Sequence, residues 1–468
     1  MLKIFFITLI ISSLFSCENR RNPNLSERRL AALMSNTASP EPTSETSVPD
    51  FIMPEGYTPQ PGVKYRQERD VSVPPVRIDV VKGIENVRNV ALSEIATGIM
   101  YINAGKHRFS PKAQITRHGI LVSNLDGAWL YSSDGQLIKE IYKNFHEHRA
   151  TGRWGVAFVT GDRFTGIERV RYNEKNDRLW LKFKDEKIGT DDYRGHLGYI
   201  DMRQQLNVTY NDELRQVPVI PLATLGKGNL GYADDFIIQY PDYQNPVLIT
   251  KSFSGDTLCR FIVGRDTVTA QGMRNSMRFD GGNEYYYRGT YSFRPPHNDT
   301  LFRLTAANVL KPKYIIDMGT WGRASNQGKP SDVNVNTMYV LNTLHEDDRF
   351  LYIRFSISNY AGSNVSRQWH GLYEKQAQEF FTLPSDFTER LNFRNGIEND
   401  IDGGLPFWAH DVGNQGEKYV CILGGVMKNV LTEEWFAKSK ASKPDKKAEL
   451  LKFMQTVEDD DSVIIIVK

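Results

Sequence analysis

Acidic residues and a histidine of the types that bind ligands or ions occur close together near residue 400. The stretch NDIDGGLPFWAHD contains Asp400, Asp402, His410 and Asp411. Carboxylate oxygens bind hard cations, and a carboxylate beside an imidazole can also transfer protons during catalysis. The residue types therefore allow a calcium loop, an acid–base pair with a histidine, or a tight turn between strands.

The EF-hand calcium pattern does not fit this stretch. With Asp402 at its fifth position and Gly403 as its invariant glycine, the twelfth position, which requires glutamate, is Ala409. No helix is predicted on either side. We therefore expect a turn at Asp402-Gly403-Gly404, whose glycines can adopt positive φ, followed by a strand over residues 405–409. The alternative is a loop at the mouth of a channel, where the four polar residues meet a ligand or an ion.

An aromatic-rich hairpin and a tryptophan in a loop are candidates for stacking on sugar rings. Residues 281–296, GGNEYYYRGTYSFRPP, place aromatic side chains on both faces of a strand pair, and Arg294 and Asn283 can supply hydrogen bonds to a ligand. Packing of these aromatics between sheets is the interpretation that we favour. Trp321 lies in a Gly/Ser/Asn-rich segment rather than in a strand, so it is the second stacking candidate.

Other patterns associated with catalysis or cofactors are weak. Residues 226–231 spell G-x-G-x-x-G, but a strand-like segment follows instead of the helix that a dinucleotide site requires. His146 and His148 could share a metal on a strand, although a polar loop is favoured and no further ligand can be named. No G-x-S-x-G nucleophile motif occurs. We therefore predict no catalytic residue, no metal site and no cofactor.

The composition predicts a β-rich globular protein that does not bind nucleic acid. The 468 residues carry a formal net charge of +2, and no basic block stands out. The 22 tyrosines and 24 phenylalanines favour strands. Cys259 and Cys421 lie in apolar, strand-like runs, so we expect buried, unpaired thiols rather than a disulfide.

The N-terminal residues have the features of a lipoprotein signal peptide. Lys3 precedes an apolar run that is shorter than the ~20 residues needed to span a bilayer. Cys17 follows Leu-Phe-Ser, a sequence that resembles the lipobox of bacterial lipoproteins. We therefore expect residues 1–16 to be a signal peptide and Cys17 to be acylated, which tethers the protein to a membrane.

The residues after Cys17 predict a tether and then a folded domain. Residues 17–75 are rich in Pro, Ser, Thr, Asn and Glu and show no apolar periodicity, which is typical of a disordered linker. Residues 76–468 form the predicted folded domain. Glu18 is followed by Asn and two Arg rather than by an acidic run, so we expect the periplasmic face of a membrane rather than the cell surface.

Short alternating segments separated by turns predict a repeated β architecture. Asp134-Gly135 marks a hairpin turn between two strand-like segments. Two pairs of segments resemble each other: residues 255–261 and 298–304, and residues 176–181 and 347–352. Strand–turn–strand units repeated at this spacing predict a β-propeller of about six blades.

Two short helices and a final strand are predicted at the C-terminus. Thr432 is suited to cap a helix, and Pro444 should end that helix. A second helix is predicted from Lys446 to about Thr456, and the tail DSVIIIVK reads as a buried strand. The predicted fold class is therefore all-β, a six-bladed β-propeller with a short helical segment near the C-terminus before a final strand.

Several segments, in a specific order, resemble the Bacteroidetes family of six-bladed β-propeller lipoproteins of unknown function. They are the lipobox and polar tether, LSEIATGIMYINAG, NDTLFRL followed by LKPKYIIDMG, NDIDGGLPFW, and the ending VEDDDSVIIIVK. FHEHRATGRWG departs from the Gly-Pro-rich turn of many relatives. The resemblance implies the fold and the location, and it supplies no catalytic residue.

Two functional classes follow from these features. The first is a non-catalytic binding or scaffold module of the cell envelope for a glycan, a peptide or a protein partner, anchored to a membrane as a monomer. The alternative is a propeller hydrolase or lyase that uses carboxylates and histidines at the channel mouth, with or without a metal. We favour the first, because no constellation with catalytic spacing occurs.

Overall fold

The structure is a computed structural model in which the chain divides into two units, of which the second comprises residues 59–468. All described residues belong to the second unit. Cys17, Trp321 and residues 146–148 lie outside them, so the predictions for these residues are untested. The described residues are 74–107, 111–124, 127–143, 158–160, 163–187, 193–203, 219–221, 230–233, 236–239, 247–252, 255–262, 283–294, 299–319, 337–358, 367–385, 395–413 and 416–468.

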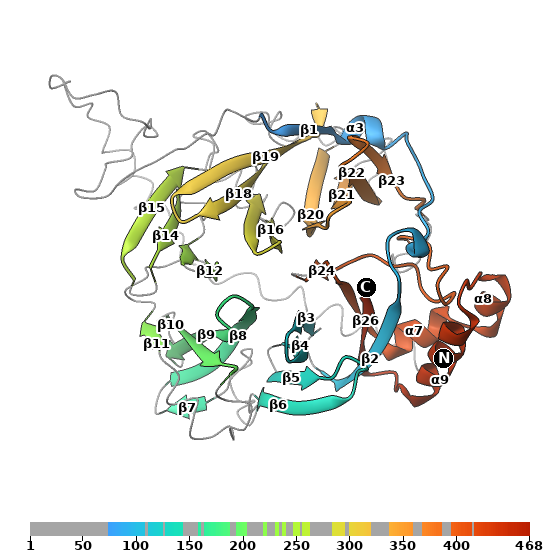
Figure 1. The fold of residues 1–468 in the computed structure, drawn as a ribbon, viewed down its shortest axis with the longest axis horizontal. Helices are drawn as coiled ribbons and strands as arrows, with labels where there is room; N and C mark the ends of the chain where they lie inside the picture. Colours follow the sequence, from blue (N-terminus) through green and yellow to red (C-terminus); the bar gives the residue numbers. More distant parts are fainter. Residues whose placement is uncertain are drawn as a thin grey trace, which may run out of the picture. The chain divides into compact units, whose positions relative to one another are not determined.

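Six β-sheets are arranged around a ring in the second unit, which confirms the predicted six-bladed β-propeller (Figure 1). Sheet 1 contains β3 (Lys112–Thr116), β4 (Gly119–Ser123), β5 (Gly127–Tyr131) and β6 (Leu137–Lys143). Sheet 2 contains β7 (Phe158–Thr160), β8 (Arg163–Asn173), β9 (Arg178–Lys187), β10 (Tyr193–Asp201) and β11 (Val219–Pro221). Sheet 3 contains β12 (Leu230–Tyr232), β13 (Ile237–Gln239), β14 (Val247–Lys251) and β15 (Thr257–Ile262).

The remaining sheets contain the strands on which the candidate site is built. Sheet 4 contains β16 (Asn283–Tyr287), β17 (Thr290–Arg294), β18 (Thr300–Ala306) and β19 (Val309–Asp317), with β1 (Val76–Asp79) added beside β19. Sheet 5 contains β20 (Thr337–Glu346), β21 (Phe350–Ser358), β22 (Arg367–Glu374) and β23 (Glu379–Thr382). Sheet 6 contains β24 (Asp411–Val412), β25 (Lys418–Leu423), β26 (Asp461–Val467) and β2 (Ile99–Lys106). Figure 1 shows β16, β20 and β24 on the inner side of their sheets.

Strands from the two ends of the described chain close the ring in sheet 6. β26 is antiparallel to both β2 and β25, with Ile102 opposite Ile464 and Cys421 opposite the same residue. The whole of β26 is buried, as predicted for the C-terminal tail. Because β2 and β26 come from opposite ends of the domain, this pairing holds the first and last parts of the ring together.

The segment from β1 to β2 runs along the outer edges of sheets 4, 5 and 6 (Figure 1). β1 is parallel to β19, and Arg88 N then donates to Thr382 O of β23 at 2.9 Å. Further along, Leu92 N donates to Glu398 O at 2.7 Å. The segment also contains the short helices α3 (Val80–Gly83) and η1 (Leu92–Glu94). It therefore satisfies backbone groups at strand edges that would otherwise be exposed.

Alternate residues of each strand pack toward the two neighbouring sheets. Tyr285 packs with Leu351 and Ile353 of sheet 5, whereas Tyr291 and Phe293 pack in the opposite direction against sheet 3. This confirms, for the described part of residues 281–296, that the aromatics fill the space between sheets. Burying side chains on both faces provides the hydrophobic free energy that holds the sheets together, at about 25 cal/mol per Å².

Cys259 and Cys421 are buried, and among the described residues neither forms a disulfide, as predicted. Cys259 lies in β15 between sheets 3 and 4, and Cys421 lies in β25 between sheets 6 and 1. Burial raises the pKa of Cys421 to about 12, so the thiol stays protonated and unreactive at neutral pH.

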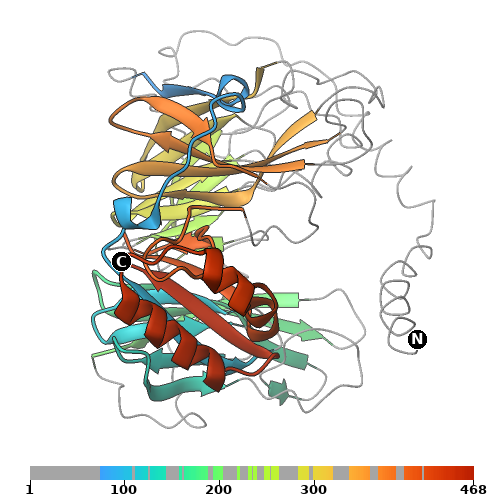
Figure 2. The same cartoon turned by 90° about the vertical axis from the view of Figure 1, so that its right-hand side faces the viewer.

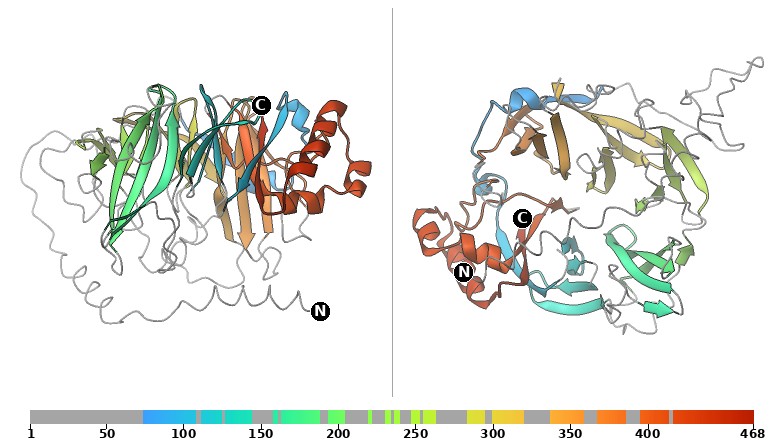
Figure 3. Two further views of the ribbon diagram at one scale, coloured as in Figure 1. Left: turned by 90° about the horizontal axis from the view of Figure 1, so that it is seen from below. Right: turned by 180° about the vertical axis from the view of Figure 1, so that it is seen from behind.

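Three helices follow β25 on the outer side of sheet 6 (Figures 2 and 3). They are α7 (Gly424–Val430), α8 (Glu433–Lys438) and α9 (Pro444–Thr456). The Thr432 hydroxyl accepts a hydrogen bond from Trp435 N at 3.2 Å, which confirms the predicted cap. Two expectations were wrong. Helix α7 was not predicted, and Pro444 begins α9 instead of preceding it, because proline at the first helical position sacrifices no intrahelical hydrogen bond.

The predicted turns are only partly equivalent in the structure. Gly135 has φ +89° in the turn between β5 and β6, which confirms that hairpin. Residues 176–181 and 347–352 both enclose the turn after a long strand, β8 or β20. In contrast, residues 255–261 lead into β15, the last strand of sheet 3, while residues 298–304 lead into β18, the third of sheet 4. The resemblance between residues 255–261 and residues 298–304 therefore reflects similar turn residues rather than equivalent positions in the sheets.

Candidate functional site

The turn at Asp402 is stabilised entirely by contacts within the protein. The Asp402 carboxylate is fully buried and accepts hydrogen bonds from Tyr101 OH at 2.8 Å, Asn399 Nδ2 at 2.8 Å and Gly404 N at 2.9 Å. Gly403 has φ +74°, a conformation that glycine adopts without strain, so the predicted turn is confirmed. Burial raises the pKa of Asp402, and the three hydrogen bonds oppose this increase.

Asp400 and the residues after the turn also have structural contacts. The Asp400 carboxylate accepts hydrogen bonds from Ser93 N at 2.9 Å and Ser93 Oγ at 2.5 Å, which ties η1 to the turn. The strand predicted over residues 405–409 is wrong: Phe407 makes only an isolated bridge to Ile397, because one pair of hydrogen bonds joins these two segments. A ligand role for Asp400 and Asp402 stays a prediction.

His410 and Asp411 lie at the opposite edge of sheet 6 from Tyr101, the partner of Asp402. Asp411 begins β24 on the inner side of the sheet, while Tyr101 belongs to β2 at the other end of the strand order. His410 N donates to Tyr419 O at 2.8 Å, which fixes the backbone that carries both residues. The structure therefore separates the four polar residues of this stretch into an outer pair and an inner pair.

The inner pair lies opposite a polar patch on sheet 5. Three residues lie on the same face of sheet 5: His345 of β20, Arg354 of β21 and His370 of β22. Arg354 is the direct partner of His370, and His345 is opposite Tyr352, two residues before Arg354 on the same strand. Tyr352 belongs to the hydrophobic cluster between sheets 5 and 6, so this face is directed toward sheet 6. Together with His410 and Asp411 the three residues form what we call the histidine site. The site brings together residues from three consecutive strands of sheet 5 and from the start of β24 in sheet 6.

Direct contacts link the two sides of the histidine site. His345 Nδ1 is 3.7 Å from Asp411 Oδ1, an ion-pair distance that exceeds a hydrogen bond. The Trp408 ring lies against His370, with ring centroids 4.5 Å apart and planes tilted by 60°. Asp411 is anchored by Tyr419 OH, which donates to Oδ2 at 3.2 Å, and by Val412 N, which donates to Oδ1 at 2.9 Å. The carboxylate is thus held on the side of sheet 6.

All three imidazoles are neutral at physiological pH. Burial lowers the pKa of His345, which the nearby Asp411 partly offsets. Burial and the positive charge of Arg354 lower the pKa of His370 to about 3. The His410 side chain is exposed at the surface, but the surrounding protein partly removes its ring from water, which lowers its pKa. The positive charge of Arg354 lowers it further, to about 4. Each ring therefore offers one N–H donor and one nitrogen acceptor.

Several polar atoms of the site and of Trp408 have no hydrogen-bond partner in the part of the chain that the structure describes. They are both ring nitrogens of His345, His370 Nδ1, Arg354 Nε and Trp408 Nε1. His345, His370 and Trp408 are at least nine-tenths buried. Buried polar groups are normally paired, so this cluster of atoms without described partners makes the histidine site the candidate that we consider further.

The arrangement does not match a metal centre. Among the described residues, no three His, Cys, Asp or Glu side chains converge as ligands of one ion. The G-x-G-x-x-G motif also lacks its structural context, because its third glycine, Gly231, lies in strand β12 rather than at the start of a helix.

Arg294 lies elsewhere in the ring, at the end of β17. It is 1% exposed and pairs in register with Asn283 of β16, the residue that the sequence grouped with it. The structure does not bring Arg294 to the histidine site through any described contact, and its ligand role stays a prediction.

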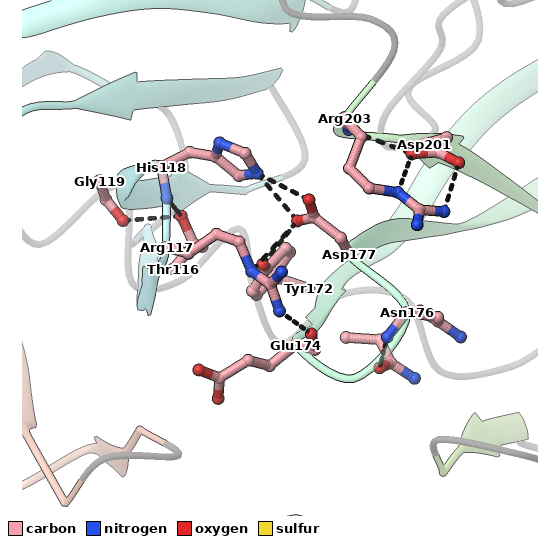
Figure 4. A network of polar contacts seen from close by, with 11 residues as sticks. Thr116, Arg117, His118, Gly119, Tyr172, Glu174, Asn176, Asp177, Asp201 and Arg203 are labelled. Atoms are coloured by element: carbon pink, nitrogen blue, oxygen red, sulfur yellow. Dashed lines mark hydrogen bonds and ion pairs between the residues drawn. The ribbon is translucent and has the colours of Figure 1, made fainter.

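A second polar network joins sheets 1 and 2 (Figure 4). His118 Nε2 lies 2.8 Å and 3.0 Å from the two carboxylate oxygens of Asp177, and Tyr172 OH donates to Asp177 Oδ1 at 2.7 Å. Arg117 Nε is 3.8 Å from the same oxygen. Asp177 is buried but fully paired, so this network resembles a structural clamp more than a ligand site.

Sequence reasoning found His410 and Asp411 but missed His345 and His370. Each missed histidine is an isolated residue within an apolar strand, LNTLHEDD or QWHGLYE. Such a residue gives no local signal, because its partners come from other strands.

Comparisons with known proteins identify a family without an assigned function. No curated protein matches the chain. One similar solved structure is a β-1,3-galactosidase of glycoside hydrolase family 43 with galactodeoxynojirimycin, at 11% identity, covering 64% of this chain and 100% of that chain with a TM-score of 0.26. Another is PorZ, an essential bacterial surface component of the type-IX secretion system of Porphyromonas gingivalis, at 10% identity, covering 69% of this chain and 42% of that chain with a TM-score of 0.23.

Neither structural likeness carries an argument about this protein at such TM-scores. Within the described residues, no helix is long and apolar enough to cross a membrane. The sequence match is more extensive, since a family model fits residues 60–433 and so includes nearly all of the propeller. The chain belongs to the family defined by this domain of unknown function, DUF4933.

Proposed function

We propose that this protein is an exported, lipid-anchored binding module of the cell envelope whose ligand site is the histidine site. The observation that supports it is the convergence of His345, Arg354 and His370 from sheet 5 with His410 and Asp411 from sheet 6. Inner strands of a propeller converge around its axis, where ligands of this fold class commonly bind.

The membrane location rests on the sequence before the propeller. The apolar run after Lys3 and the lipobox-like Leu-Phe-Ser-Cys17 are typical of a Bacteroidetes lipoprotein signal, and residues 17–75 have the composition of a tether. An acyl chain contributes about 0.8 kcal/mol per buried CH₂, so a multiply acylated Cys17 would hold the protein at a membrane. The basic residues after Glu18 favour the periplasmic face.

Binding fits the chemistry of the site better than catalysis. A general base works best when its pKa is near the working pH, whereas the pKa of His370 is lowered to about 3 and that of His410 to about 4. Glycoside hydrolysis uses two carboxylates, and Asp411 is the one that the described residues bring to these histidines. Neutral imidazoles act well as hydrogen-bonding groups for a glycan or a peptide.

A hydrolase or lyase is the second candidate, because Asp411 lies 3.7 Å from His345. A carboxylate beside an imidazole is the arrangement that activates a general base, and ligand binding can shorten such a contact. This candidate requires product formation that depends on Asp411.

The two parts of the proposal can be tested separately. For the anchor, Cys17→Ala should release the chain from the membrane fraction and abolish labelling with a fatty-acid analogue; retention and labelling of the variant would refute it. For the site, a panel of envelope glycans and peptides is screened by thermal shift with the unaltered protein and with Arg354→Gln. Ligand-induced shifts that disappear in Arg354→Gln support the site. Product formation lost in Asp411→Asn would instead establish an enzyme.

A further inference from the structure

Arg354 is a cation with no counter-ion among the residues that the structure describes. Its guanidinium donates through Nη2 to Gln368 Oε1 at 2.7 Å, a neutral partner, and among the described residues no carboxylate lies within ion-pair distance of it. Burial lowers the pKa of Arg354. A partly buried arginine is normally paired, because desolvating an unpaired charge costs several kcal/mol.

The neighbouring groups add further polar atoms that have no partner among the described residues. Arg354 is the cross-strand partner of His370, whose buried Nδ1 has no hydrogen-bond partner in the described part of the chain, and the same is true of Trp408 Nε1 beside it. Arg354 Nε and Trp408 Nε1 can only donate, and a neutral imidazole supplies a further N–H. Arg354 thus combines a positive charge with nearby N–H groups that have no described partner, and an oxygen-rich anion is the kind of ligand that accepts hydrogen bonds from such groups.

The carboxylate of the site does not occupy this position. Both Asp411 oxygens already accept hydrogen bonds, from Val412 N and Tyr419 OH, and Asp411 Oδ1 lies 3.7 Å from the neutral imidazole of His345. Lys112 also faces His345 and adds positive charge on that side. The balance of charge around Arg354 is therefore positive.

The inner strand is irregular at the same level. The register of β20 with β21 shifts between Val340, opposite Phe355, and Leu344, opposite Ile353, so extra residues of β20 face the single position of Arg354. Bulges of this kind free backbone groups from the ladder and occur frequently beside binding sites.

We infer that the histidine site binds an oxyanion, the carboxylate, sulfate or phosphate group of an acidic ligand, through Arg354, His370 and Trp408. The inference rests on the proposed function, because it assigns a ligand class to the same site. Arginine forms paired, charge-assisted hydrogen bonds with each of these groups. An acidic glycan and a phosphorylated compound share this chemistry.

The test uses the protein from which only residues 1–16 are absent, with Cys17→Ser to keep it in solution. Binding of glucuronate, sulfate, inorganic phosphate and uncharged glucose is measured by calorimetry at constant ionic strength maintained with chloride. The probes distinguish the source: glucuronate represents an acidic sugar, and phosphate represents a phosphorylated compound. We expect at least one oxyanion to bind and glucose not to bind.

Variants show whether the binding occurs at this site. Arg354→Gln should weaken oxyanion binding by about tenfold or more, since a charge-assisted pair is lost. His370→Asn should weaken it less, and it provides a second variant if Arg354→Gln does not fold. Arg288→Gln is the matched control, because Arg288 has an exposed ion pair with Asp348 and should leave binding unchanged.

Each outcome separates the inference from the proposed function. Glucose or a neutral glycan binding in an Arg354-dependent manner would retain the site and overturn the oxyanion inference. Oxyanion binding that is unchanged in both site variants would also overturn it. If no acidic or neutral ligand depends on Arg354 or His370, both the inference and the proposed ligand site are wrong.

Discussion

Glu346 provides a quantitative test of how sheets 4 and 5 are joined. Its carboxylate is 1% exposed and accepts hydrogen bonds from Tyr285 OH at 2.8 Å and Tyr314 OH at 3.0 Å. Lys375 Nζ lies at 2.6 Å, and Arg303 makes a further charged hydrogen bond to it. One buried carboxylate thus balances two cations at the junction.

Replacing Glu346 by glutamine removes the charge and keeps the shape of the side chain. Arg303 and Lys375, which are only 15% and 20% exposed, then lose their counter-ion. Breaking a buried pair on one side typically costs 3–5 kcal/mol. Because burial already lowers the pKa of Lys375, this lysine can release its proton and reduce the penalty. We therefore expect Glu346→Gln to lose about 3 kcal/mol of the free energy of unfolding.

Asp348→Asn is the matched control at the same junction. Asp348 pairs with Arg288 at 2.8 Å, but the two side chains are 70% and 68% exposed. An exposed pair contributes about 0–1 kcal/mol and is screened by salt, so this variant should lose little, and nothing in about 1 M salt. Urea unfolding followed by tryptophan fluorescence measures both variants. Equal losses, or a loss below about 1 kcal/mol for Glu346→Gln, would refute the assignment of the junction's stability to burial.

Two further predictions concern the histidine site and the turn at Asp402. The pKa of His370 is lowered to about 3 in the folded protein, so the stability that comes from keeping this ring neutral is fully present above the pKa of the unfolded chain and is lost as the pH falls. Between pH 7 and pH 5 the free energy of unfolding should therefore decrease by about 2 kcal/mol, and His370→Asn should not show this decrease. Urea unfolding at both pH values measures the difference. Tyr101→Phe removes a hydrogen bond to buried Asp402 and should lower the free energy of unfolding by about 1–3 kcal/mol. Ser93→Ala removes a hydrogen bond to the more exposed Asp400 and should lower it by less than about 1 kcal/mol. The reverse order of unfolding midpoints would contradict the argument from burial.

The fold was largely predictable because its signals are local. Alternating side chains, the Asp134-Gly135 turn and the all-apolar tail depend on neighbouring residues, and the structure contains the corresponding hairpin and the buried β26. Helix α7 was missed because Gly424 and Gly425 have poor helix propensity. Its start is fixed by tertiary packing, since a side chain at Gly424 would meet Glu458 O at 2.1 Å.

The site was only partly predictable because its members come from distant strands. His410 and Asp411 were conspicuous beside each other in the sequence, but they appeared to belong with Asp400 and Asp402. The structure places Asp402 against Tyr101 on β2, whereas Asp411 lies against His345 on β20. Sequence proximity grouped the wrong residues, since a turn can send its two sides to opposite edges of one sheet.

The resemblance between residues 176–181 and residues 347–352 corresponds to contacts between neighbouring sheets that the sequence alone could not show. Asp177 and Asp348 each lie in the turn after a long strand. Asp177 pairs with Arg117 in the first turn of sheet 1 (Figure 4), and Asp348 pairs with Arg288 in the first turn of sheet 4. A propeller needs contacts between neighbouring sheets, and these two turns supply them, with a buried carboxylate at Asp177 and an exposed one at Asp348. The repeated Asp-Arg pair therefore serves the joining of sheets. Arg354 differs from these turn arginines, because it lies within strand β21 and its described partner is the neutral side chain of Gln368 instead of an acid of a neighbouring sheet. This difference distinguishes the histidine site from the structural junctions at the turns.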